Sequence, residues 1–161
     1  MTLPFFAAVG IIKKERKIIG HNCIGWILHL FSGKSIIGDI RVDFKYGNMG
    51  IDVFEYLKDI DEIKKCNFKT IIIDAPYNQR FADKYQEIGR TPKQFIIFGN
   101  AKKTTELFDR IIEISPVIII LKSWNYYCLK GYEIKKCYIC YPRGYRKSTF
   151  LIIMKKINTE V

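Results

Sequence analysis

The stretch Thr70-Ile71-Ile72-Ile73-Asp74-Ala75-Pro76-Tyr77-Asn78 decides the expected fold. Its first four residues form an apolar run that predicts a buried strand. Asp74, Pro76 and Tyr77 then stand at the carboxyl end of that strand, which is the edge where open α/β sheets bind ligands. Asp and Pro also favour turns, so the segment from Asp74 to Tyr77 taken alone is more often a turn than an active site. The order of the surrounding elements decides between these alternatives.

Strands and helices are expected to alternate along the whole chain. We expect strands at 27–31, 40–44, 51–53, 70–74, 116–121, 133–141 and 149–155, with helices at about 54–67 and 91–114 and a candidate break at Gly99-Asn100. This alternation predicts an α/β fold with a mostly parallel sheet, helices on both faces and a C-terminal antiparallel hairpin. A chain of 161 residues is expected to form a single domain, here 1–161, with an N-terminal segment (1–24) before the core (25–157).

The formal net charge of +11 favours a polyanionic partner, most commonly nucleic acid. The alternative is a lysine-rich chain whose lysines are simply solvated. No apolar run is long enough to cross a bilayer and no secretory signal is recognisable, so we expect a cytoplasmic protein with no membrane partner. The five cysteines are irregularly spaced, and Cys137-Tyr-Ile-Cys140 has no second pair. We therefore expect neither a disulfide framework nor a metal site.

The order of these elements resembles the class I S-adenosylmethionine-dependent methyltransferases, and specifically the DNA and RNA enzymes that methylate exocyclic amino groups of bases. Those enzymes carry an Asp/Asn/Ser-x-Pro-Tyr/Phe motif at the end of their fourth strand, where Asp74 to Tyr77 stand. Their first motif, Asp-x-Phe-x-Gly-x-Gly, is matched at Phe31 and Gly33 by the segment from His29 to Ser35. His29 and Ser35 depart from that motif, and the usual helix between the first two strands has no room. The resemblance implies a Rossmann-like methyltransferase sheet in a divergent, minimal form.

The resemblance implies that S-adenosyl-L-methionine is the cofactor. Its contacts would come from Phe31, Gly33, Asp43, Asp52, Val53 and Asp74. Asp43 would bind the ribose, with Asp39 as a rival and a solvated carboxylate as the alternative. Asp52 would meet the cofactor adenine beside Val53, and its alternative is the N-cap of the following helix. Gly33 is otherwise an ordinary turn glycine, and His21 and His29 are interpreted as structural.

The catalytic residues implied by the motif are Asp74, Pro76 and Tyr77. Asp74 and the Ala75 carbonyl would accept the two hydrogens of the target amine, while Tyr77 would stack on the base. Nucleic-acid contacts are expected from residues near the same edge of the sheet: Asn78, Arg80, Lys84, Trp124, Arg143, Arg146 and Lys147. The alternatives are a solvated charged loop and, for Trp124, a cap on the core.

The sequence thus predicts an S-adenosylmethionine-dependent methyltransferase that acts on an exocyclic amino group of a nucleic-acid base. Adenine in DNA is the favoured target, which would be flipped out of a duplex. An RNA base methyltransferase is the close alternative, and a homodimer is left open. A non-catalytic nucleic-acid-binding module with a degenerate methyltransferase fold is the rival from another functional class.

Overall fold

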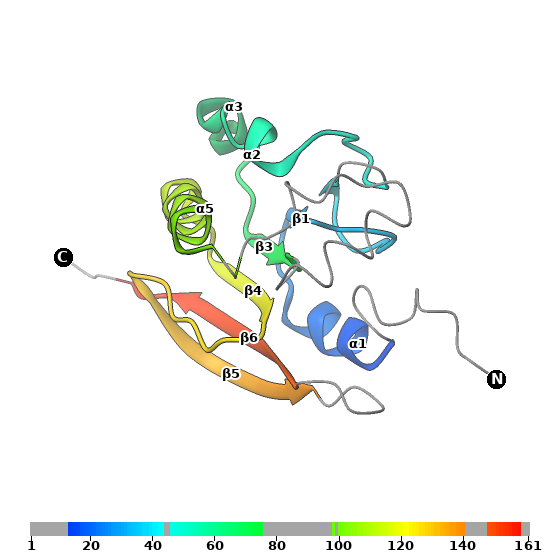
Figure 1. Ribbon diagram of the computed structural model, residues 1–161, viewed down its shortest axis with the longest axis vertical. Coiled ribbons are helices and arrows are strands. Elements are labelled where there is room, and N and C mark those ends of the chain that lie inside the picture. Colours follow the sequence, from blue (N-terminus) through cyan, green and yellow to red (C-terminus); the bar gives the residue numbers. More distant parts are fainter. Residues whose placement is uncertain (1–12, 44–45, 76–97, 99, 141–147, 159–161) are drawn as a thin grey trace.

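The computed structural model describes residues 13–43, 46–75, 98, 100–140 and 148–158 (Figure 1). Its elements, in chain order, are α1 (Lys13–Asn22), β1 (Ile27–Leu30), β2 (Ile40–Val42), α2 (Val53–Tyr56), α3 (Ile60–Lys65), β3 (Thr70–Ile73), α5 (Ala101–Ile114), β4 (Ile118–Ser123), β5 (Tyr132–Cys140) and β6 (Thr149–Lys156). None of the described helices is long and apolar enough to cross a membrane.

The strands form one six-stranded sheet in the order β2-β1-β3-β4-β6-β5. The first four strands in this order are parallel, and β6 is antiparallel to both β4 and β5. Because β6 reverses the direction and β5 reverses it again, β5 points the same way as β4. The predicted fold class is confirmed: the sheet is like that of the Rossmann-like methyltransferases, mostly parallel with antiparallel strands at its C-terminal end.

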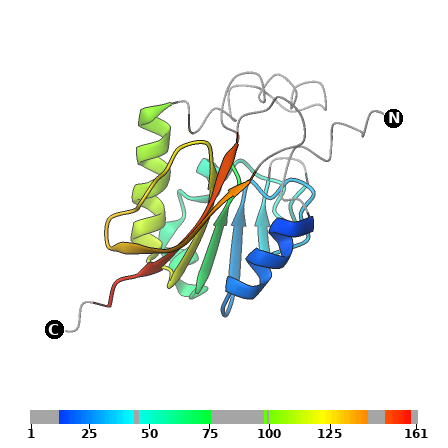
Figure 2. The same cartoon turned by 90° about the horizontal axis from the view of Figure 1, so that it is seen from below.

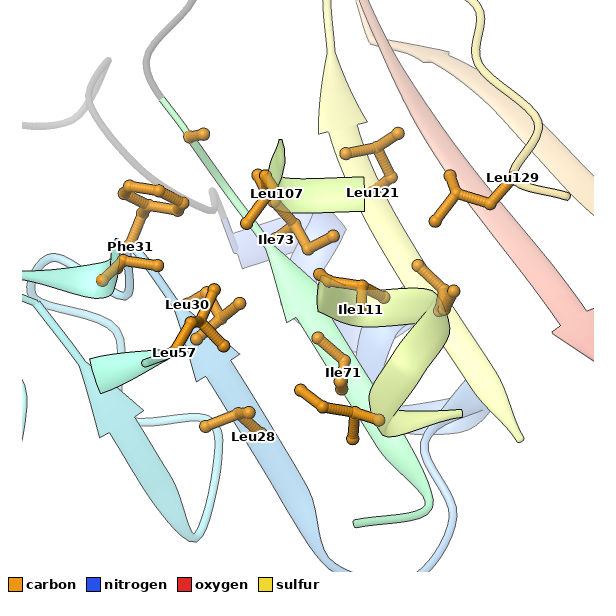
Figure 3. Packing of buried hydrophobic residues seen from close by; sticks show 14 of the residues in the cluster. Leu28, Leu30, Phe31, Leu57, Ile71, Ile73, Leu107, Ile111, Leu121 and Leu129 are labelled. Atoms are coloured by element: carbon orange, nitrogen blue, oxygen red, sulfur yellow. The ribbon is translucent and has the colours of Figure 1, made fainter. Parts of the chain in front are cut away.

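Helices cover both faces of the sheet (Figures 1 and 2). On one face, Ile71 and Ile73 of β3 pack in a large apolar core with Leu107 and Ile111 of α5 (Figure 3). On the other face, Ile72 packs with Ile19 of α1 in a much smaller cluster. The four residues of β3 are all buried because the strand is covered on both sides. This explains the continuous apolar run that predicted it.

Three local predictions were wrong. The segment 51–53 forms no strand, since Asp52 caps α2, which begins at Val53, and a single parallel bridge from Val42 to Met49 stands beside β2 instead. The helix expected at 54–67 is two short helices, α2 and α3. Helix α1 lies in the segment for which no element was predicted. Of the helix expected at 91–114, the structure describes α5, which begins after Asn100; the Asn100 side chain accepts from the Lys103 amide as the N-cap, and residues 91–97 lie outside the described part of the chain.

The connection from β1 to the parallel strand β2 contains no helix, as the sequence predicted. It is made by residues 31–39 alone, fewer than a parallel crossover normally needs. Ile37 of this loop packs against the small cluster on the α1 face, and its carbonyl bonds to the His29 ring at 2.9 Å. The loop therefore covers the first strand at the place where a helix would otherwise lie.

Candidate active site

Three neighbouring parallel strands bring their carboxyl ends together (Figure 2). Polar residues follow each of these strands in the sequence. Asp43 follows β2, the segment from Phe31 to Ser35 follows β1, and Asp74 follows β3. Asp43 is 3% exposed and Asp74 is 8% exposed, so both carboxyl groups are largely shielded from water. Buried carboxylates at this edge of an open sheet are placed where such folds bind ligands.

Asp43 holds the loop that follows β1. Its Oδ2 accepts from the Gly33 amide at 3.0 Å, and its Oδ1 accepts from the Tyr46 amide at 3.0 Å. The side chain thus fixes two loops at once and is not the solvated carboxylate of the alternative interpretation. Its rival Asp39 lies before β2, at the opposite edge, where it accepts from the Ile27 amide. Of the two, Asp43 is therefore the one at the ligand edge.

The loop after β1 turns sharply. Phe31 has φ of 59° and Gly33 has φ of 52°, both in the left-handed region. The Ser32 amide donates to the Val42 carbonyl at 3.2 Å, and the Ser35 amide donates to the Ser32 carbonyl at 2.9 Å. A left-handed turn of this kind is inexpensive at glycine and brings the backbone close to whatever binds beside it. The Phe31 side chain itself belongs to the large apolar core.

Asp52 is the N-cap of α2, the alternative that the sequence left open. Its Oδ1 accepts from the Phe54 amide at 2.9 Å and from the Glu55 amide at 3.2 Å. Capping uses part of the acceptor capacity of a carboxylate, and the side chain is only half-buried. Val53, expected beside the adenine ring, is 2% exposed and packs in the core.

Asp74 lies on the α1 face of the sheet. Ile71, Ile73 and Ala75 all belong to the large core on the opposite face, so Asp74 alternates onto the same side as Ile72. The Asp74 amide donates to the Leu30 carbonyl at 3.3 Å, which extends the pairing between β3 and β1. The carboxyl group is therefore held on a rigid strand end and not on a free loop.

A buried ion pair lies beside Asp74. The Lys122 ammonium donates to the Glu15 Oε2 at 2.9 Å, and the two side chains are only 9% and 5% exposed. Burial by itself lowers the pKa of Lys122, but the negative charges of Asp74 and Glu15 outweigh it and leave that pKa raised. Lys122 is therefore charged and stands between two carboxylates from different elements.

The sequence interpretation missed both Glu15 and Lys122. The burial of Lys122 could have been predicted from the sequence. The lysine directly follows the apolar run of β4, and the alternation of a strand places it on the same face as the buried Ile120. Glu15 had no comparable signal, since it lies in a charged segment and its partner is 107 residues away.

Two buried polar atoms at the end of β1 have no hydrogen-bond partner within the described part of the chain: His29 Nε2 and Ser32 Oγ. The His29 ring is fully buried, and burial lowers its pKa to about 4, so it is neutral at pH 7. Because the Ile37 carbonyl only accepts, Nδ1 carries the proton and Nε2 is an acceptor. His29 thus offers a hydrogen-bond acceptor at the position where the first motif of the resembling methyltransferases carries an Asp carboxylate.

Comparisons of the chain with protein-family models, with curated proteins and with solved structures found no match.

Several predicted site residues lie outside the described residues. These are Pro76, Tyr77, Asn78, Arg80, Lys84, Arg143, Arg146 and Lys147. Trp124 is described: it follows β4 directly and is partly buried. The structure thus brings Asp43, Gly33 and Asp74 to one edge of the sheet, with Lys122 and Glu15 beside Asp74. In the parts of the chain that are described, no group of three His, Cys, Asp or Glu side chains is placed to hold a metal ion.

Proposed function

We propose that the protein is an S-adenosylmethionine-dependent methyltransferase that acts on an exocyclic amino group of a nucleic-acid base. The observation that carries this proposal is the position of Asp74, a shielded carboxyl group at the carboxyl end of the central strand β3. It is followed by Ala75, Pro76 and Tyr77, the order of residue types that such enzymes use to hold an amine. Adenine in DNA is the first choice of target, and RNA is the second.

The residues at the end of β1 fit the proposed cofactor. A cofactor that carries an ammonium group, a carboxylate and ribose hydroxyls offers both donors and acceptors. Ser32 Oγ and His29 Nε2 are buried and lack partners among the described residues, and a buried polar atom is costly until it is paired. Gly33 would allow close approach of the backbone, and Asp43 and Asp52 would accept from hydroxyl or amino groups. When bound, the group supplies an electrophilic methyl on a sulfonium.

Asp74 supplies what a weakly nucleophilic base amine needs. The amine lone pair is delocalised into the ring, so an acceptor that holds one N–H helps to localise it and to aim it. Positive charge builds on this nitrogen as the new N–C bond forms, and a fixed carboxylate stabilises that charge more strongly than the neutral ground state. Holding the amine in line accounts for much of the lowering of the barrier. The proton that the amine loses passes to Asp74 or to water.

The charge of the chain supports a nucleic-acid substrate. The net charge is +11, and exposed lysines include Lys34, which stands in the loop after β1 with its ammonium 5.2 Å from the centre of the Tyr46 ring. Cations at the rim of the site would hold phosphates without reading sequence. Arg80, Lys84, Arg143, Arg146 and Lys147 are proposed for the same role.

The test is methyl transfer from isotope-labelled cofactor to genomic DNA and to total RNA. We expect labelled base in one of them, and we expect Asp74→Ala to lower the rate by at least about a hundredfold because a positioned acceptor is lost. The exposed Asp109→Ala on α5 is the matched control and should leave the rate unchanged. Undiminished transfer by the Asp74→Ala protein would refute the assigned role.

A second candidate is a nucleic-acid-binding module that no longer transfers methyl groups. Two observations favour it: the loop from 31 to 39 replaces the usual helix, and both oxygens of Asp43 already hold backbone amides. Calorimetry separates the two functions. Heat of binding with S-adenosylmethionine supports the enzyme, whereas no binding at millimolar cofactor, together with binding to DNA or RNA, supports the module.

A further inference from the structure

We propose that Lys122, held by Glu15, is a positioning residue that orients the Asp74 carboxylate and keeps it ionised for the incoming base amine. This inference rests on the proposed function, because it assigns a role to a residue behind the proposed catalytic group.

The strand register places the two side chains together. In the parallel pair of β3 and β4, Ile73 stands opposite Leu121, so Asp74 is level with Lys122 on the next strand. Both alternate onto the α1 face, as Ile72 and Ile120 do. Side chains level with each other on neighbouring strands start roughly 5 Å apart, which brings a lysine ammonium within reach of the carboxylate.

Glu15 of α1 holds the Lys122 ammonium from the helix that covers this face of the sheet. It comes from the first turn of α1, is 3% exposed, and accepts from Lys122 at 2.9 Å. A lysine stem has four rotatable bonds, and this contact holds its end in one place. Without Glu15, Lys122 would neutralise Asp74. With Glu15 present, the three charges leave one net negative charge, which suits a reaction centre that carries positive charge.

Other titratable groups face the same side of the sheet. Cys140 of β5 lies close enough for Glu15 and Lys122 to act on its thiol, and His29 of β1 pairs with Ile72, two positions before Asp74. Burial, with a further contribution from Glu15, raises the pKa of Cys140 to about 11, and burial lowers the pKa of His29 to about 4. Both groups are therefore neutral at pH 7. Among the described charged groups, Arg41 of β2 and Asp43 act on His29, whereas Lys122 interacts with both Asp74 and Glu15.

The experiment measures the protonation of Asp74 directly. In protein labelled with ¹³C-aspartate, the side-chain carboxyl resonance of Asp74, assigned by its absence in Asp74→Asn, is followed against pH. We expect Lys122→Met to move its midpoint up by about one pH unit or more, because a neighbouring cation is lost. We expect Glu15→Gln to move it down, because a neighbouring anion is lost. A general loosening of the site would not produce shifts of opposite sign.

The exposed pair Lys64–Glu113, which joins α3 to α5 at 3.0 Å, supplies the matched control. Lys64→Met and Glu113→Gln should leave the Asp74 midpoint where it is. If Lys122→Met does not fold, the double variant Glu15→Gln/Lys122→Met replaces it, since it removes both members of the buried ion pair and does not leave the Glu15 carboxylate buried without its partner. Its midpoint should lie between those of the two single variants.

Methyl transfer is then measured on the same proteins. We expect Lys122→Met to lower kcat about tenfold to a hundredfold at pH 7 with unchanged affinity for the cofactor, and to shift the acid limb of the pH profile upward. Unchanged midpoints in both single variants overturn the role of Lys122, whatever the activity. A wild-type protein that transfers no methyl group, while the midpoints move as expected, overturns the proposed function and leaves only the coupling of the charges.

Discussion

The fully buried His29 makes the stability of the protein depend on pH in a way that one substitution can isolate. Its ring lies on β1 beneath the loop from 31 to 39, and its Nδ1 donates to the Ile37 carbonyl at 2.9 Å. Burial lowers its pKa from 6.5 to about 4. In the unfolded chain the ring regains its ordinary pKa, so the two states bind different numbers of protons between pH 4 and pH 6.5.

The sign and size of the effect follow from this difference. Below pH 6.5 the unfolded state takes up a proton that the folded state refuses, so acid favours unfolding. The stability contributed by the neutral ring is complete above pH 6.5 and is lost as the pH falls towards 4. Each pKa unit corresponds to about 1.4 kcal/mol, so His29 alone should lower the free energy of unfolding by about 2 kcal/mol between pH 7 and pH 5.

Urea denaturation at pH 7 and pH 5 tests this for the wild type and for His29→Gln, which removes the titrating ring and keeps an amide that can donate. Other groups also titrate in this range, but they are common to both proteins and cancel in the comparison. The exposed His21→Gln variant is the control and should behave as the wild type does. If the wild type and His29→Gln lose equal stability on acidification, then His29 is not buried in its neutral form and the reasoning fails.

Two further predictions concern Gly47, which lies close to β2, and Cys140, which ends β5. A Cβ at Gly47 would lie 2.0 Å from a backbone oxygen of β2, whereas a Cβ at Gly50 would meet nothing within 4 Å. Gly47→Ala should therefore lower the free energy of unfolding by about 1–3 kcal/mol, and Gly50→Ala should change it little, as denaturant titration would show; equal effects would contradict the packing. The pKa of Cys140, raised to about 11 by burial, leaves about a hundredfold less thiolate at pH 8 than the ordinary value of 9.0 would. Mass spectrometry should show that iodoacetamide modifies it far more slowly than the exposed Cys66; equal rates would contradict its burial.

The strands were predictable because their signal is local. Thr70 to Ile73 and the run that begins at Pro116 are buried on both faces, so they are continuously apolar, and this pattern does not depend on distant partners. The position of Asp43 was predictable from the strand before it, since a residue after a parallel strand lies at the ligand edge in any sheet of this kind. The capping role of Asp52 was predictable. That a helix and not a strand forms here was not, because the three residues 51–53 are compatible with a short strand and equally with the start of a capped helix.

Helix α1 was not predicted because its inward face is only partly apolar. Ile19 packs against the sheet, but Glu15 also points inward, and a buried glutamate breaks the pattern by which an amphipathic helix is recognised. The residue that makes its burial tolerable is Lys122, far along the chain. Pairing between residues that distant is a property of the folded topology, which a single sequence does not display.

The two faces of the sheet contribute differently to the protein. The face under α2, α3 and α5 holds nearly all of the large apolar core, and this burial supplies most of the stability. The α1 face holds a four-residue apolar cluster together with His29, Asp74 and Lys122, all buried. Buried charged groups such as Lys122 contribute little or no stability relative to apolar residues of the same size. Their presence on one face, next to the carboxyl ends of the parallel strands, therefore calls for an explanation other than folding, and the proposed role of Asp74 in methyl transfer would provide one.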